Sequence, residues 1–159
     1  MNEITIRKAT IEDIETIQNL NHKLCLKENS EFDPTINTEY SLSDSGYKYF
    51  KWRIEGSDSI TLIAVNGGNN GVGYLIGAVI DTYDYSTIRC LAEAENMYIE
   101  ESYRNQGIGG KLITQFEDWC STKKVERVRY VASADNKEAI KFYKNHGASE
   151  VSVTLEKDI

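Results

Sequence analysis

The chain has 159 residues, 40% of them apolar and only one of them proline, which suits a single compact globular domain spanning residues 1–159. Its formal net charge of −7 argues against a nucleic-acid-binding protein, because such proteins carry an excess of basic residues. No apolar run approaches the roughly 20 residues that span a bilayer, and the first residues lack the features of a signal peptide, so no membrane partner is expected. Three widely spaced cysteines are typical of a reducing cytoplasm.

The first half of the chain predicts a strand followed by two helices. Ile4 to Arg7 alternates as a short strand. Apolar residues then recur on one helical face, behind a start that resembles a capping box at Thr10 and Asp13: Ile11, Ile14, Ile17, Leu20 and Leu24. The polar stretch from Lys27 to Glu39 predicts an irregular connection. A second helix carries the apolar and aromatic residues Tyr47, Phe50 and Ile54 and ends at Gly56.

The second half predicts a hairpin and then alternating strands and helices. Two apolar strands, residues 60–65 and 72–80, flank a turn rich in glycine and asparagine. The remaining predicted elements are a strand over 91–99, a helix over 111–122 with Ile108 also facing inward, a strand over 125–132, a helix over 136–145 and a closing strand over 151–155. The order βααβββαβαβ predicts a mixed sheet with helices on both faces.

Three glycines within four positions, Gly107, Gly109 and Gly110, separate the strand over 91–99 from the following helix. Without a Cβ, the backbone can approach a bound group closely, and the free N–H groups of a helix's first turn favour an anion. A strand–glycine turn–helix unit of this kind can hold phosphate. The run does not match a P-loop, because Leu112 stands where Ser or Thr is needed after Lys111. It also lacks the GxGxxG pattern of a dinucleotide fold.

The run instead resembles the acyl-CoA pyrophosphate loop of the GNAT superfamily of N-acetyltransferases, (Gln/Arg)-x-x-Gly-x-(Gly/Ala), with Arg104, Gly107 and Gly109 at its fixed positions. Ala94 to Ile99 is similar to that family's fourth strand, and Asn136 to Gly147 to its Asn-x-x-Ala-x-x-Phe-Tyr-x-x-x-Gly helix. The resemblance implies an α/β (α+β type) fold, with a mostly antiparallel sheet of six to seven strands flanked by four helices.

The resemblance also implies acetyl-CoA as acyl donor and names residues that would hold it. The main chain of the loop would bind the pyrophosphate, together with the Arg104 side chain: Asn105, Gln106, Gly107, Ile108, Gly109, Gly110 and Lys111. The pantetheine arm would lie along the end of the fourth strand like an added strand, against main-chain groups of Met97, Tyr98 and Ile99. Asn136 would cap its helix and contact the arm.

Two carboxylates, Glu93 and Glu95, are candidates for the base that deprotonates the amine. Alternation places both on one face of the strand unless a bulge intervenes. Glu93 has the spacing of the family's glutamate base, eleven residues before Arg104, whereas Glu95 lies nearer the expected reaction centre and could instead bind the substrate ammonium. A solvated pair remote from substrate is the alternative.

Tyr143 is the candidate general acid, because the resemblance places its hydroxyl beside the departing thiolate. Core packing is the alternative, since Phe142 and Tyr143 are adjacent. The aromatics of residues 40–52, with Tyr83 and Tyr85, lie where the family lines its acceptor site, although core packing explains them equally well. His22 and His146 are isolated, so no metal site is expected.

The sequence therefore predicts an N-acetyltransferase that moves an acetyl group from acetyl-CoA to a primary amine by direct transfer in a ternary complex. The acceptor is a small molecule or a peptide, the protein is a monomer or a homodimer, and its location is cytoplasmic. The alternative is a non-catalytic protein of the same fold that senses or binds acyl-CoA.

Overall fold

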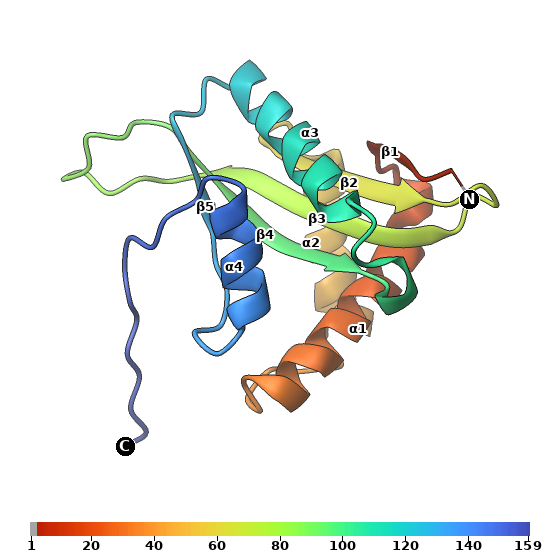
Figure 1. Ribbon diagram of the computed structural model, residues 1–159, viewed down its shortest axis with the longest axis horizontal. Helices are drawn as coiled ribbons and strands as arrows, with labels where there is room; N and C mark the ends of the chain where they lie inside the picture. Colours follow the sequence, from red (N-terminus) through yellow and green to blue (C-terminus); the bar gives the residue numbers. More distant parts are fainter. Residues whose placement is uncertain (1–2) are drawn as a thin grey trace.

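The computed structural model describes residues 3–159, which form one five-stranded sheet in the order β1-β2-β3-β4-β5 (Figure 1). The strands are β1 (Thr5–Lys8), β2 (Ser59–Val65), β3 (Gly71–Ile80), β4 (Leu91–Ile99) and β5 (Arg127–Tyr130). The helices are α1 (Ile14–Glu31), α2 (Asp44–Glu55), α3 (Ile108–Thr122) and α4 (Lys137–Asn145). Neighbouring strands are antiparallel except β4 and β5, which are parallel. The mixed, mostly antiparallel sheet with four helices confirms the predicted fold class.

Helices α1 and α2 cover one face of the sheet. The buried side chains of α1 recur at the predicted spacing, and those of α2 include Phe50 and Ile54, so each helix turns one apolar stripe to the sheet. They pack with alternate residues of β2 and β3 in one core cluster, which contains Ile63, Tyr74 and Ile76. This core fixes the position of α1 and α2 behind the sheet in Figure 1.

Helix α3 covers the opposite face, and α4 lies on the same side next to β5 (Figure 1). Leu112 and Phe116 of α3 are fully buried against Leu75 and Ala92 of the sheet. Phe142 and Tyr143 of α4 pack at the margin of this second core. The two cores, one on each face, hold the sheet between the helix pairs.

Several predicted bounds were wrong in ways that have physical causes. Helix α1 continues through Glu31, inside the stretch expected to be irregular, because Lys27 and Glu31 form an ion pair one turn apart on its exposed side. Helix α3 begins at Ile108, so Gly109 and Gly110 belong to its first turn. Strand β5 covers only Arg127–Tyr130 of the predicted 125–132.

Within residues 3–159, no helix has the length and apolar character needed to cross a membrane.

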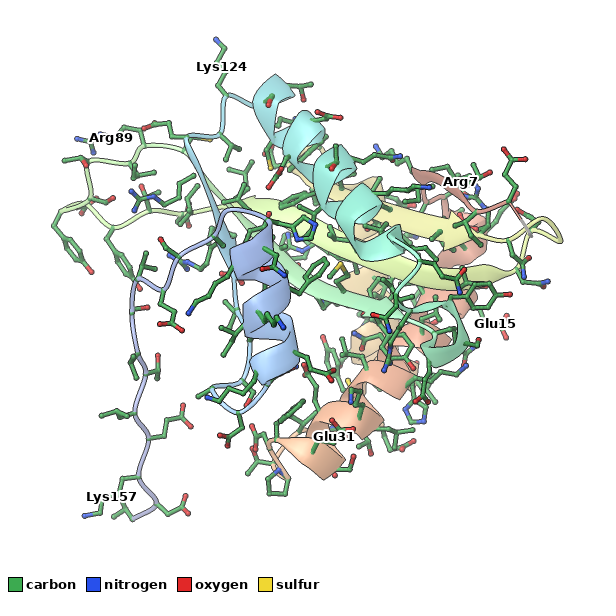
Figure 2. The ribbon with its side chains drawn as sticks, viewed as in Figure 1. Arg7, Glu15, Glu31, Arg89, Lys124 and Lys157 are labelled. Carbon is green, nitrogen blue, oxygen red and sulfur yellow. The ribbon has the colours of Figure 1, made fainter. Side chains whose placement is uncertain are left out.

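The predicted closing strand over residues 151–155 is not formed, so the sheet has five strands where six to seven were expected. Its apolar residues alternate as a strand would, but Val153 is 82% exposed and Leu155 is 90% exposed. Figure 2 shows the tail running away from the body of the protein, with Lys157 near its end. Alternation gives a segment two different faces but does not by itself form the hydrogen bonds of a strand pair, and β5 remains the outermost strand of the sheet.

Removal of residues 151–159 should therefore change the free energy of unfolding by less than about 0.5 kcal/mol, because the tail buries almost no surface. Chemical denaturation of the truncated and full-length proteins measures this difference. Leu112→Ala, a core substitution expected to cost about 2–5 kcal/mol, shows that the assay detects a real loss. A loss of several kcal/mol on truncation would mean that the tail pairs with the sheet in solution.

Candidate functional site

The glycine loop ends in a helix N-terminus with unused hydrogen-bond donors. Gly107 is the N-cap of α3 and adopts a left-handed conformation, with φ of 77°, and a Cβ at this position would meet no atom within 4 Å. The first intrahelical bond runs from the Lys111 N–H to the Gly107 carbonyl at 3.1 Å. Among residues 3–159 no side-chain hydrogen bond caps this end of the helix, so the N–H groups of Ile108, Gly109 and Gly110 are left for an anion to bind.

Gly109 has a different role, since it joins the loop to the rest of the site. A Cβ at this position would lie 3.0 Å from Cζ of Phe142 in α4 and 3.3 Å from Cδ1 of Ile99 in β4. The absence of a side chain therefore brings the start of α3 into close contact with both elements. The loop, the end of β4 and α4 are consequently neighbours, as the sequence motifs predicted.

Arg104 ties the start of the loop to the end of β4. Its Nε donates a hydrogen bond to the Ile99 carbonyl at 3.0 Å, and its guanidinium lies 5.5 Å from the ring centroid of Tyr98. Its two Nη groups have no hydrogen-bond partner among residues 3–159, so they remain available to a bound anion.

The main chain at the end of β4 presents alternate residues to its two edges. The Glu100 N–H donates to the Val72 carbonyl at 2.9 Å, and the register then alternates between hydrogen-bonded and non-hydrogen-bonded pairs. Tyr98 consequently bonds to β3, whereas the N–H and C=O groups of Met97 and Ile99 point toward the other edge. The bond from Arg104 to the Ile99 carbonyl lies on that edge, in agreement with this assignment.

That other edge is only half covered by β5. The parallel pairing of β4 and β5 joins Leu91–Ala94 to Arg127–Tyr130 and stops there, five residues before β4 ends. In the described part of the chain no strand pairs with this edge from residue 95 onward. The main-chain groups of Met97 and Ile99 therefore face a gap in the strand pairing at this edge, whereas the main chain of Tyr98 does not.

A β-bulge marks the point where the two strands part. The register of β3 and β4 shifts so that Ile76 faces Asn96 and Gly77 faces Ala94, which leaves Glu95 as the extra residue. A bulge bends its strand and increases the local twist, and this accounts for the divergence of β4 from β5.

The Glu95 carboxylate is fully occupied by α2. Arg53 contacts both oxygens, through Nη2 and through Nε at 2.8 Å, and the Tyr49 hydroxyl donates to Oε2 at 2.6 Å. Asn96 in turn donates to the Tyr49 oxygen at 3.1 Å. Burial raises the pKa of Tyr49, and the Glu95 charge raises it further, so the phenol stays a donor. This network ties the bulge to α2.

The Glu93 carboxylate has fewer hydrogen-bond partners than the Glu95 carboxylate. It lies opposite Arg129 of β5, whose Nη1 is 3.3 Å from Oε2, and the side chain keeps 23% of its surface exposed. Its second oxygen has no hydrogen-bond partner among residues 3–159. The two candidate bases are therefore not equivalent: Glu95 is held by three donor groups and Glu93 by one.

Tyr143 lies beside the gap, on α4. Its ring stacks on Tyr130 of β5 at 4.6 Å between centroids, and its hydroxyl has no hydrogen-bond partner among residues 3–159. Burial raises the pKa of Tyr143 to about 12, with a further contribution from the charge of Glu28, so the phenol is protonated at neutral pH. Asn136 caps α4, accepting the Ala139 N–H at 3.0 Å, as predicted.

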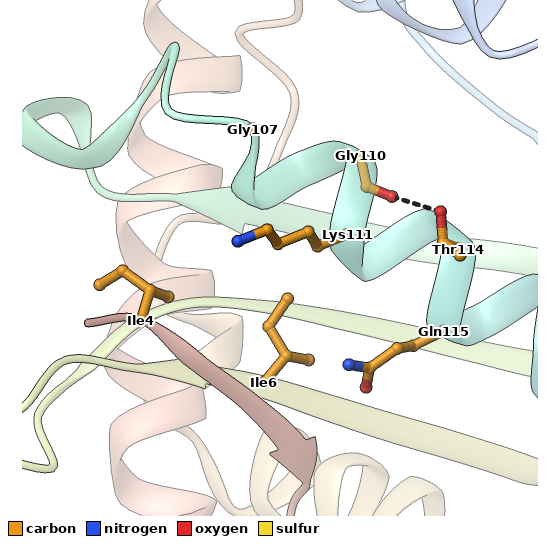
Figure 3. Close-up of a pocket in the computed structure, with 7 residues that line it drawn as sticks. All are labelled: Ile4, Ile6, Gly107, Gly110, Lys111, Thr114 and Gln115. Carbon is orange, nitrogen blue, oxygen red and sulfur yellow. Dashed lines mark hydrogen bonds between the residues drawn. The ribbon is translucent and has the colours of Figure 1, made fainter.

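Lys111 lies on the side of α3 that faces β1. Figure 3 shows its side chain in an open pocket of about 490 Å³, where it extends toward Ile4. Its main-chain N–H is used within the helix, so only its ammonium group is available to a ligand. The pocket adjoins Gly107 but lies on the far side of α3 from α4.

The comparisons with known proteins agree with this geometry. The model of the acetyltransferase (GNAT) family matches residues 24–148, most of the chain. The chain belongs to the GNAT acetyltransferase family. A search of curated proteins finds no match to this GNAT protein.

Solved structures share the GNAT fold at low sequence identity. A mutant of the BH1408 protein from Bacillus halodurans has a TM-score of 0.86 and 18% identity, over 98% of this chain and 99% of that chain. The aminoglycoside N-acetyltransferase AAC(6')-Iy in complex with CoA has a TM-score of 0.80 and 16% identity, over 100% and 96%. AAC(6')-Ih from Acinetobacter baumannii, an aminoglycoside 6'-N-acetyltransferase, has a TM-score of 0.75 and 18% identity, over 99% of each chain.

One residue that contacts a predicted site residue was missed by the sequence analysis. Arg53, which binds the Glu95 carboxylate, follows Tyr49 by one helical turn, so both lie on one face of α2, and an arginine on an otherwise apolar face was the available signal. Of the predicted aromatics, Phe50 is core and Trp52 stacks on Arg53 at 4.0 Å.

Arg53→Met should lower the free energy of unfolding by about 2–3 kcal/mol, because it leaves the mostly buried Glu95 carboxylate without its charged partner. Chemical denaturation measures this loss. Lys144→Met is the matched control, since Lys144 and Glu150 form an exposed ion pair whose removal should cost about 0–1 kcal/mol. Equal effects of the two substitutions would show that the network does not hold α2 to β4.

Proposed function

We propose that this GNAT protein is an acetyl-CoA-dependent N-acetyltransferase that transfers the acetyl group directly to a primary amine within a ternary complex. The observation that carries the proposal is that two sets of main-chain N–H groups without hydrogen-bond partners lie next to one another. One is the start of α3, with the N–H groups of Ile108 to Gly110, and the other is the unpaired edge of β4 at Met97 and Ile99. A long ligand with a pyrophosphate at one end and amide groups along its arm is complementary to both.

The donor would lie with its pyrophosphate at the start of α3, near the free Nη groups of Arg104. Its amide-bearing arm would then add to the edge of β4, bonding to main-chain groups of Met97 and Ile99. The Ile99 carbonyl is already used by Arg104, so this residue offers its N–H. The neighbour AAC(6')-Iy, solved with CoA and with a bisubstrate analogue, supports a CoA thioester as the ligand.

At the reacting end, the acetyl group passes from sulfur to nitrogen. The amine nitrogen loses a proton and attacks the thioester carbonyl, whose oxygen is stabilised by main-chain N–H groups at the end of β4. The C–S bond then breaks, and the thiolate accepts a hydrogen bond or a proton from the Tyr143 hydroxyl. Glu93 is the better candidate base, because the oxygens of Glu95 are occupied by Arg53 and Tyr49.

The same neighbours support the class of acceptor that we propose. The structures of AAC(6')-Ih and AAC(6')-Iy are of enzymes that acetylate aminoglycosides, which are small molecules bearing amines. They support a small-molecule amine acceptor here as well.

Cys25, Cys90 and Cys120 are free thiols, which supports a location in a reducing cytoplasm.

Calorimetric titration tests donor binding. Acetyl-CoA should bind with saturation and more tightly than adenosine diphosphate, because only acetyl-CoA has the arm that pairs with β4. Arg104→Met should raise the dissociation constant for acetyl-CoA about tenfold, since it removes a charge-assisted contact to phosphate. Arg89→Met, at an exposed arginine outside the site, is the control. Binding of the diphosphate as tightly as acetyl-CoA would contradict the placement of the arm.

Thiol release in the presence of amines tests catalysis. Glu93→Gln should lower kcat about a hundredfold and Tyr143→Phe about tenfold, because each removes a proton-transfer group, while neither changes the affinity for acetyl-CoA. Rates unchanged in both variants would remove this mechanism. Acetyl-CoA binding without thiol release from any amine would instead favour a non-catalytic acyl-CoA-binding protein.

A further inference from the structure

Glu95 and Asn96 direct their side chains to the same face of β4, although they are neighbours in the strand. Both contact Tyr49 of α2, since the Tyr49 hydroxyl donates to Glu95 and Asn96 donates to the Tyr49 oxygen. The residues before and after this pair, Ala94 and Met97, both pack in the core on the α3 side of the sheet. The bulge therefore reverses the alternation of β4 at this point.

This reversal determines which main-chain groups lie on the free edge of β4. Side chains and main-chain N–H groups both alternate along a strand, so a shift of one residue exchanges the roles of all the residues that follow. With the bulge, Met97 and Ile99 present their N–H groups to the edge that extends past β5, and Tyr98 bonds to β3. Without the bulge, Tyr98 would present its N–H group to that edge instead.

Main-chain pairing alone does not fix the course of β4 through the bulge. Within residues 3–159, Glu95 lies opposite no residue of β3, and the pairing of β4 with β5 ends at Ala94. The side-chain contacts of Glu95 and Asn96 are therefore what determines the position of this part of the strand. All of these contacts come from one helix, α2.

Helix α2 is a fixed platform for these contacts. Phe50 and Ile54 anchor it in the core, and the Ser59 hydroxyl, at the start of β2, donates to the Arg53 carbonyl at 2.8 Å. The Arg53 guanidinium is also confined, because it lies 4.0 Å from the ring centroid of Trp52. It consequently has a defined position from which it binds the bulged residue.

We propose that Arg53 is a positioning residue for the acyl donor. By binding both oxygens of Glu95, it keeps the bulge in place and so presents the N–H groups of Met97 and Ile99 to the arm of acetyl-CoA. Arg53 acts through β4 and not by contact with the donor. This role rests on the proposed function and deepens it.

The two ends of the donor depend on different parts of the protein. The arm pairs with β4 beyond the bulge, whereas the pyrophosphate binds at the start of α3. Loss of the Arg53 contacts should therefore weaken the binding of acetyl-CoA and leave that of adenosine diphosphate, which lacks the arm, unchanged. A protein that is only less stable would show no such difference, because both ligands bind the same folded molecules.

Calorimetric titration of folded Arg53→Met with the two ligands tests the assignment. The dissociation constant for acetyl-CoA should rise about tenfold, and that for adenosine diphosphate by less than about twofold. Lys51→Met removes an exposed cation from the same helix and should change neither value. Tyr49→Phe, a milder change that removes the hydroxyl contacting both residues of the bulge, should raise the value for acetyl-CoA about threefold and serves as the test if Arg53→Met does not fold.

A double variant separates the position of the bulge from its charge. Arg53→Met combined with Glu95→Met leaves neither charge unpaired, and apolar residues can replace a buried ion pair without loss of stability. The denaturation midpoint should therefore return toward that of the wild type. The dissociation constant for acetyl-CoA should stay raised, because the contacts that direct residue 95 to α2 are gone.

Three results would overturn the assignment. Equal weakening of both ligands in Arg53→Met, or in Tyr49→Phe where that variant is the test, would mean that the network supports the fold as a whole. Unchanged binding of both ligands would mean that the bulge keeps its position without these contacts. Recovery of the affinity for acetyl-CoA in the double variant would show that Arg53 only compensates the charge of Glu95.

Failure of the proposed function is distinguishable from failure of this inference. Binding of acetyl-CoA by the wild type no tighter than that of adenosine diphosphate would contradict the placement of the arm, and the role of Arg53 with it. Tighter binding of acetyl-CoA by the wild type, with the same ratio of the two dissociation constants in Arg53→Met, would contradict only the role of Arg53.

Discussion

The parting of β4 from β5 after Ala94 is the constraint on which the site depends. Parallel strands normally satisfy one another's main-chain groups along their whole length, and here the pairing stops five residues before β4 ends. The N–H groups of Met97 and Ile99 and the carbonyl of Met97 are left without a strand partner, next to a helix N-terminus that also has unused donors. Unsatisfied donors at two adjoining places favour a ligand long enough to reach both.

The bulge at Glu95 lies where β4 and β5 part, and its hydrogen-bond partners on α2 fix its position. Arg53 and Tyr49 bind the bulged residue from the helix layer, so the position of α2 and the course of β4 are linked. The helix layer of α2 is thereby connected to β4 through one partly buried ion pair.

Much of the fold could be predicted from local patterns. The strands of the hairpin, β4 and the inward stripes of α1 and α3 follow from periodicity, which is set by the residues themselves. The closing strand over 151–155 was wrong because alternation alone does not determine whether a segment pairs, and this segment pairs with no strand. The extent of α1 was wrong because its last turns are polar on the exposed side and are stabilised by the pair of Lys27 and Glu31.

The site was predictable only where a motif fixes the main chain. The cap at Asn136 is as the motif indicated, and the turn from Arg104 to Gly107 leads into a helix, although that helix begins at Ile108 and not at Lys111. Tyr143 stacks on Tyr130, the last residue of β5. Glu93 and Glu95 could be distinguished only once the hydrogen-bond partners of each carboxylate were known. Arg53, which binds Glu95, lies 42 residues away from it in the sequence.

The most direct measurement is of the amide resonances of Met97 and Ile99 in isotope-labelled protein during titration with acetyl-CoA and, separately, with adenosine diphosphate. The account predicts that acetyl-CoA shifts these two amides and slows their exchange with solvent, whereas the diphosphate shifts only those of Gly107 to Gly110. Unchanged Met97 and Ile99 amides in the presence of saturating acetyl-CoA would contradict it, because the edge of β4 would then not be where the donor binds.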